Sequence, residues 1–150
     1  MLITEKIIVF RLCLTFVLTG ILGLERHIHR KNAGFRTHIL VGIGSCLVTL
    51  IGIYTYEIYG GDVMRLSAQI ISGLGFLGSG LIIKEHKSIT GLTTAAGLWV
   101  NGCIGIAIGT GFYLAAITTV LLCLLTHNFT KFIYNKVERK KQEYNEDVDI

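Results

Sequence analysis

The chain has 150 residues, of which 51% are hydrophobic and 16% are charged, and its formal net charge at pH 7 is +4. Soluble domains usually carry about a quarter charged residues, whereas here Asp, Glu, Lys and Arg are absent from 39–56, 66–83 and 88–130. This pattern disfavours a soluble globular domain. The basic residues lie mainly at the ends of apolar runs, as the positive-inside rule expects, and no aromatic–basic pattern indicates a base-stacking surface, so the positive charge does not indicate nucleic-acid binding.

Five apolar segments follow one another, each near the length of about 20 residues that crosses the hydrocarbon core of a bilayer. We expect transmembrane helices over approximately 5–24, 38–57, 67–84, 92–108 and 111–130. Since only Gly109-Thr110-Gly111 separates the last two, this pair can instead form a re-entrant element. The predicted fold is all-α: a polytopic bundle of about five transmembrane helices, with a membrane domain over 1–130 and a charged tail over 131–150.

The distribution of Lys and Arg predicts the orientation of these spans. Eleven of the fourteen lie after the first span, after the third span or in the tail. Short loops rich in Lys and Arg remain in the cytoplasm. Five spans therefore place the N-terminus outside and the C-terminus in the cytoplasm, with the lipid bilayer as the immediate partner of the helices.

Polar and small residues inside the predicted spans are informative, because polar groups are costly at membrane depth. Arg11 either extends outward to the headgroups or has a functional role. Gln69 and Asn101 are interpreted mainly as hydrogen-bonding groups between helices. Small residues in the third and fourth spans favour close helix packing, with a close approach of backbone to an ion or small ligand as the alternative. The packing candidates are Gly73, Gly78, Gly80 and Gly97.

One carboxylate, Glu25, lies in a dense basic run at the end of the first span, in the stretch GILGLERHIHRKNAGFRTH over 20–38. The run is either a topology anchor or a functional charge cluster. His38 opens the second span, where it can cap the helix, pair with Glu25 or titrate near neutral pH. Cysteines, histidines and carboxylates show no metal-ligand spacing, and no nucleophile–base motif occurs. We therefore expect no enzymatic activity, no bound metal and no cofactor.

Four blocks of the sequence resemble, in order, the signature blocks of the MgtC/SapB family. They are GLER at 23–26, AGFRTH at 33–38, SGLGFLGSG at 72–80 and GLTTAAGLW at 91–99. The resemblance implies a multi-pass protein of the bacterial or archaeal inner membrane. It also implies a link to growth at low magnesium, survival inside host cells and restraint of the membrane ATP synthase. Longer relatives carry a soluble C-terminal domain, whereas a charged tail of about twenty residues follows the fifth span here, and His27 stands where many relatives have an acidic residue.

Residues matching the family blocks are carried over by position: Glu25, Arg26, Arg36, Thr37, His38, Gly73, Gly78, Gly80, Thr93, Thr94 and Trp99. We hypothesise that Glu25, Arg36, His38, Thr93 and Thr94 form one cytoplasmic polar cluster that binds an anion, a lipid headgroup or a partner's helix.

Two functions are consistent with this reading. The preferred one is a regulatory protein that interacts with another membrane complex such as ATP synthase, and the alternative is a cation (Mg²⁺) transporter or channel. Mg²⁺ prefers oxygen ligands, including carboxylates, and the arginines near Glu25 disfavour a magnesium pore built by one chain. The glycine-rich helix faces also suggest a homo-oligomer.

Overall fold

The computed structural model describes residues 4–86 and 88–127. The predicted tail over 131–150, and the end of the last predicted span, lie outside these residues. The described helices are α1 (Glu5–Ile28), α2 (Phe35–Tyr59), α3 (Arg65–Ser79), α4 (Leu92–Thr110) and a final helix, Tyr113–His127, called here the last helix.

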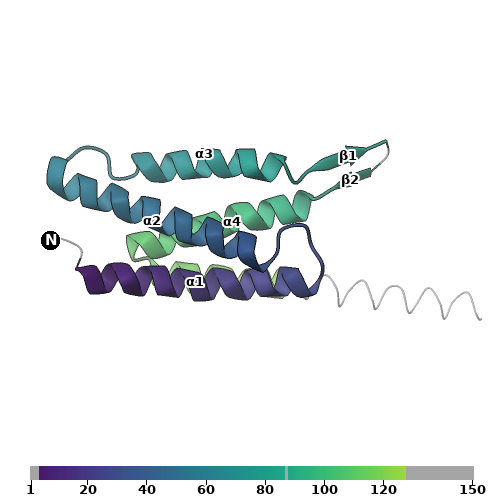
Figure 1. Cartoon of the computed structure of the whole chain (residues 1–150), viewed down its shortest axis with the longest axis horizontal. Coiled ribbons are helices and arrows are strands. Elements are labelled where there is room, and N and C mark those ends of the chain that lie inside the picture. The colour runs from purple at the N-terminus through teal and green to yellow at the C-terminus, as the bar shows by residue number, and fades with distance from the viewer. Residues whose placement is uncertain (1–3, 87, 128–150) are drawn as a thin grey trace, which may run out of the picture.

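The four labelled helices run back and forth along one long axis (Figure 1). The turn between α1 and α2 therefore lies at the same end of the bundle as the strands β1 (Ile83–Glu85) and β2 (Ser88–Thr90). We call this end the hairpin end and the opposite one the far end. Within the described part of the chain, α1, α2 and α4 are each long and apolar enough to cross a membrane. The predicted all-α membrane bundle is confirmed.

The third predicted span ends earlier than expected, since α3 stops at Ser79 rather than at 84. Gly78 and Gly80 weaken the helix, and the β-branched residues that follow favour extended backbone. β1 pairs antiparallel with β2, with Ile83 opposite Thr90. Gly91 then begins α4 at a φ of 87°, where a Cβ would collide with the carbonyl of Leu81. The sequence did not predict this hairpin.

The helices of the core approach one another through small residues. A Cβ placed on Gly105 of α4 would lie 2.9 Å from Ser45 Cβ and 3.1 Å from the backbone nitrogen of Cys46 on α2. A Cβ on Gly23 of α1 would lie 2.8 Å from His38 Cβ. These contacts leave no room for larger side chains, so the α1–α2 and α2–α4 crossings require glycine.

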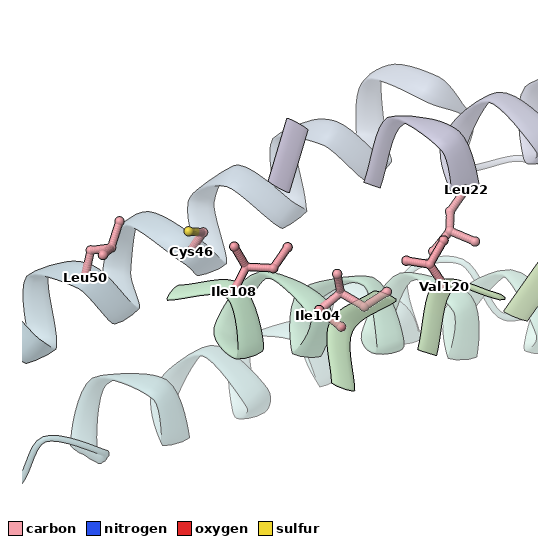
Figure 2. Close-up of a cluster of buried hydrophobic side chains, with 7 residues drawn as sticks. Leu22, Cys46, Leu50, Ile104, Ile108 and Val120 are labelled. Atoms are coloured by element: carbon pink, nitrogen blue, oxygen red, sulfur yellow. The ribbon is translucent and has the colours of Figure 1, made fainter. Parts of the chain in front are cut away.

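Apolar side chains from α1, α2, α4 and the last helix fill the space between these crossings (Figure 2). Those labelled there are Leu22, Cys46, Leu50, Ile104, Ile108 and Val120. Because α1 and the last helix both contribute, the first and last described helices belong to one packed unit.

α3 is held on a narrower face than the other helices. Leu74 is buried and lies against Gly102 of α4, and a Cβ on Gly78 would lie 3.6 Å from Ala95 Cβ. Of the predicted packing glycines, Gly73 and Gly97 have open space where a Cβ would be placed. Gly80 would meet the Leu77 carbonyl of its own turn at 3.5 Å. One face of α3 is therefore uncovered by the part of the chain that the structure describes.

A candidate polar site at the hairpin end

A partly open cavity of about 950 Å³ lies at the hairpin end. Its wall is built from the end of α1, the α1–α2 turn, the junction of β2 with α4, and the end of the last helix. The polar and charged residues of the wall are Glu25, Arg26, His29, Arg30, Lys31, Asn32, Thr90, Thr93, Thr94, Thr126 and His127. Three stretches that are distant in sequence, 25–32, 89–94 and 126–127, thus meet around one volume, and three of their side chains are those of Arg or Lys.

Arg26 joins α1 to α4 in this wall. Its side chain is only 5% exposed, and Nη2 donates a hydrogen bond to Oγ1 of Thr94 at 3.0 Å. Arg26 lies in the last turn of α1, and Thr94 lies in the first turn of α4, so their contact follows from the antiparallel direction of the two helices. An arginine is rarely this buried unless its side chain is paired.

Glu25 is next to Arg26 and bridges two histidines. Its Oε1 lies 3.1 Å from Nδ1 of His29, and its Oε2 lies 3.0 Å from Nδ1 of His127. Nδ1 of His29 is also 2.8 Å from the backbone oxygen of Glu25, so this nitrogen faces two acceptors and carries the hydrogen. Glu25 therefore connects α1 to the end of the last helix.

Glu25 and His127 are close enough for an ion pair, but their atoms are not aligned for a hydrogen bond. Glu25 Oε2 and His127 Nδ1 are both buried, and neither makes a hydrogen bond with a described residue. Buried polar atoms usually have hydrogen-bond partners. Each of these two atoms therefore has the other, at 3.0 Å, as its one described polar partner.

The first turn of α4 faces the same cavity, since Gly91, Leu92, Thr93 and Thr94 all line it. No side chain of the described residues caps this helix end. The first N–H groups of a helix have no acceptor within it, and the helix dipole makes this end positive. Arg26 therefore lies at the positive end of α4, where a buried cation is electrostatically unfavourable without a nearby anion.

The structure brings together only part of the predicted cluster. Glu25, Thr93 and Thr94 line the cavity, as does Arg26. His38 is 2% exposed, with Nδ1 at 3.1 Å from the Gly34 carbonyl oxygen. It is close enough to Glu25, Arg26 and His127 to experience their charges.

Two residues carried over from the family blocks lie outside the cavity wall, and three residues that were not predicted for the cluster belong to it. Arg36 and Thr37 are exposed on the first turn of α2 and do not belong to the cavity wall. Arg30, Lys31 and His127 belong to it, although the sequence analysis did not place them there. Lys31 had been counted only for topology, and Arg30 only as one of the arginines near Glu25. The sequence carried one signal for His127: with five spans, the first and the last both end on the cytoplasmic side, which puts His127 at the same end as Glu25.

The three polar residues predicted inside the spans have different environments. Arg11 binds at the far end, where Nη1 donates to the Gly109 carbonyl at 2.7 Å and Nε donates to the Tyr113 hydroxyl at 3.0 Å. Asn101 is fully buried, and its Nδ2 donates across helices to the His38 carbonyl at 2.6 Å. Gln69 is exposed on α3.

Comparison with known proteins identifies the family. The model of the MgtC family matches residues 12–136. The chain is 38% identical to an uncharacterized protein of Haemophilus influenzae over 92% of the chain and 62% of that protein. It is 37% identical to the Escherichia coli protein named "Putative magnesium transporter YhiD", over 85% of the chain and 64% of that protein.

A third relative is Protein SapB of Bacillus subtilis, which is 36% identical over 87% of the chain and 59% of that protein. The chain thus spans about three fifths of the length of these curated relatives. No solved structure matches it. The four sequence blocks, the apolar helical bundle and the family match agree, and the chain belongs to the MgtC family of membrane proteins.

Proposed function

We propose that this chain is a regulatory, non-enzymatic protein of the inner membrane that supports growth at low magnesium by acting on another membrane complex. The observation that carries the proposal is the cavity at the hairpin end, with Arg26, Arg30 and Lys31 in its wall. The positive-inside rule directs this end to the cytoplasm. The membrane ATP synthase is the first complex to test, because the family resemblance links longer relatives to its restraint.

The chemistry of the wall favours recognition of negative charge over passage of a cation. Mg²⁺ is bound by carboxylates and retained waters. Here the Glu25 carboxylate is already paired with His29 and His127. The neighbouring basic side chains repel a divalent cation. A headgroup or an acidic segment of a partner suits this wall better.

Replacing Glu25 tests the proposal. Glu25→Gln keeps the shape of the side chain and removes the charge that holds two imidazoles. In a strain deleted for its own MgtC-family gene, we expect this variant to be inserted at normal abundance and to lose most of the growth that the wild-type chain restores at low magnesium. Glu5→Gln, at the exposed start of the same helix, is the matched control and should behave as wild type. Full growth with Glu25→Gln would return the basic run to the role of a topology anchor.

A magnesium transporter is the second candidate, favoured by the name of the Escherichia coli relative and by a carboxylate at the cavity. The measurement is Mg²⁺ flux into proteoliposomes that hold the purified chain, with Glu25→Gln beside it. Saturable flux that this substitution abolishes would replace the regulatory proposal. Flux equal to that of empty liposomes, from folded and inserted protein, would support regulation.

We also propose that the chain self-associates through the uncovered face of α3. Phe76 is 80% exposed there, Gln69 is exposed, and Gly73 has open space beside it. Small and polar residues on a membrane helix favour contact with another helix. Gly73→Cys should cross-link between copies in membranes, whereas Leu40→Cys, on an exposed part of α2, should not. Equal cross-linking at both positions would contradict a specific α3 interface.

A further inference from the structure

We propose that the cavity at the hairpin end binds a phosphate group, carried either by an acidic phospholipid or by a phosphate compound dissolved in the cytoplasm. This inference deepens the proposed function, because it names the ligand class of the same site. Three observations carry it: a buried arginine at a helix N-terminus, an excess of basic side chains and N–H donors in the wall, and the size and mixed polarity of the cavity.

The first observation is the position of Arg26. Its charge is buried at the positive end of the 19-residue helix α4, and its described hydrogen-bond partner is a neutral hydroxyl, Thr94 Oγ1. A cation and a helix N-terminus repel each other, and an anion between them attracts both. The guanidinium has five N–H donors in a planar fork that matches phosphate oxygens. The arrangement is therefore favourable when a phosphate group is present.

The second observation is the excess of positive charge and of N–H donors in the wall. Glu25 Oε2 and His127 Nδ1 lie 3.0 Å apart, and each has the other as its one described partner. The uncapped first turn of α4 offers further N–H groups. Glu25 is the one acidic side chain in the described wall, against Arg26, Arg30 and Lys31. The wall therefore has a net positive charge and free donors, which are the features of an anion site.

The third observation is the shape of the cavity. A volume of about 950 Å³ is ample for a headgroup or a small phosphate compound. Ile89 and Leu92 also line the cavity and are 54% and 55% exposed. An apolar border beside a basic pocket suits a phospholipid, whose glycerol and first methylene groups leave the phosphate toward the bilayer. The free phosphate compound remains the other source of the same chemistry.

The test uses the full chain in two arms. In the first, the chain is purified in detergent with equal amounts of phosphatidylcholine and phosphatidic acid, and native mass spectrometry counts the lipids retained. In the second, the chain is placed in phosphatidylcholine nanodiscs and titrated with inorganic pyrophosphate by calorimetry. The double variant Arg30→Gln/Lys31→Gln changes two exposed residues of the wall and leaves the core intact. Arg36→Gln is the control, since Arg36 is an exposed cation of the same end outside the wall.

We expect one arm to show binding that the double variant weakens about tenfold or more, because each lost charge-assisted contact is worth at least that factor. Arg36→Gln should change it less than twofold. Retention of phosphatidic acid alone identifies a lipid headgroup, and pyrophosphate binding identifies a soluble ligand. No binding in either arm, or equal weakening by both variants, would overturn the inference. Growth restored by the wild-type chain and lost with Glu25→Gln would still stand in that case, so the two proposals fail separately.

Discussion

Each end of the bundle holds an arginine of α1 against α4, but the two arginines meet opposite ends of that helix. At the far end, Arg11 donates to the Gly109 carbonyl at 2.7 Å and to Tyr113 at 3.0 Å. Helix C-termini are negative and carry unpaired carbonyl groups, so a cation is stabilised there. At the hairpin end, Arg26 lies against Thr94 at the positive terminus. The charge of Arg11 is stabilised by the helix terminus that it contacts. The charge of Arg26 is not, and a bound anion would stabilise it.

We propose that this difference separates a structural contact from a functional one. Arg11 bonds to Gly109 at the end of α4 and to Tyr113 at the start of the last helix, so both partners belong to the chain itself. Arg26 borders a cavity of about 950 Å³ together with Arg30 and Lys31. Substitutions at the far end should therefore change stability, while substitutions at the hairpin end should change ligand binding and growth more than stability.

The largest effect on stability is expected for Arg11→Ala. It removes both hydrogen bonds and leaves the Gly109 carbonyl and the Tyr113 hydroxyl without this partner, which we expect to lower the free energy of unfolding by about 3 kcal/mol. Unfolding in mild detergent, followed by circular dichroism, measures it. Tyr113→Phe keeps the ring and removes one bond, and should lower the same free energy by only about 1 kcal/mol. A melting curve of Arg11→Ala that overlays the wild type would refute the structural role.

A smaller loss is expected for Gly111→Ala. Gly111 ends α4 at a φ of 89°, and a Cβ there would lie 2.8 Å from Nη2 of Arg11. The left-handed conformation alone costs a non-glycine residue about 1–2 kcal/mol. The same unfolding measurement checks this value. Gly44→Ala is the control, because Gly44 is helical and faces open space, and it should not be destabilised. Equal behaviour of the two alanine variants would show that the α4 terminus tolerates a side chain.

The smallest stability effect is expected at the hairpin end, for Thr94→Val. This change keeps the shape of the side chain and removes the acceptor of the Arg26 hydrogen bond, at a cost of about 1 kcal/mol. Growth at low magnesium should fall clearly, because Arg26 loses its fixed orientation in the wall. The melting temperature should change only slightly. Thr93→Val, at an exposed neighbour, is the comparison. If Thr94→Val unfolds the chain as readily as Arg11→Ala, the proposed contrast between the two ends is wrong.

Periodic and compositional signals were sufficient for the helices. The long uncharged runs predicted five helices, and α1 and α2 begin within a few residues of the expected positions. The hairpin was missed because Leu81, Ile82 and Ile83 continue the apolar run of α3. Three-residue strands are too short for an alternating pattern to reveal them.

The site was only partly predictable, because it depends on contacts between distant segments. The family blocks and the topology brought Glu25 and Thr94 to the same end. They also suggested Arg36, which is exposed on a different face of the bundle end. The pair of Glu25 with His127 joins residues from the first and last helices, and helix rotation decides which side chain faces the cavity. Sequence spacing within one segment contains no information on that rotation.

The short length of α3 has a consequence for the surrounding lipid. Its 15 residues rise about 22 Å, less than the roughly 30 Å of a bilayer's hydrocarbon core. A turn over 80–81 follows α3, and extended backbone begins only at β1 (Ile83–Glu85), so the rest of a crossing on this side is non-helical. A crossing made in this way leaves non-helical backbone near the interface, where the pairing of β1 with β2 satisfies part of it. Hydrophobic mismatch is therefore concentrated on one side of the molecule, so thin membranes should accommodate α3 best.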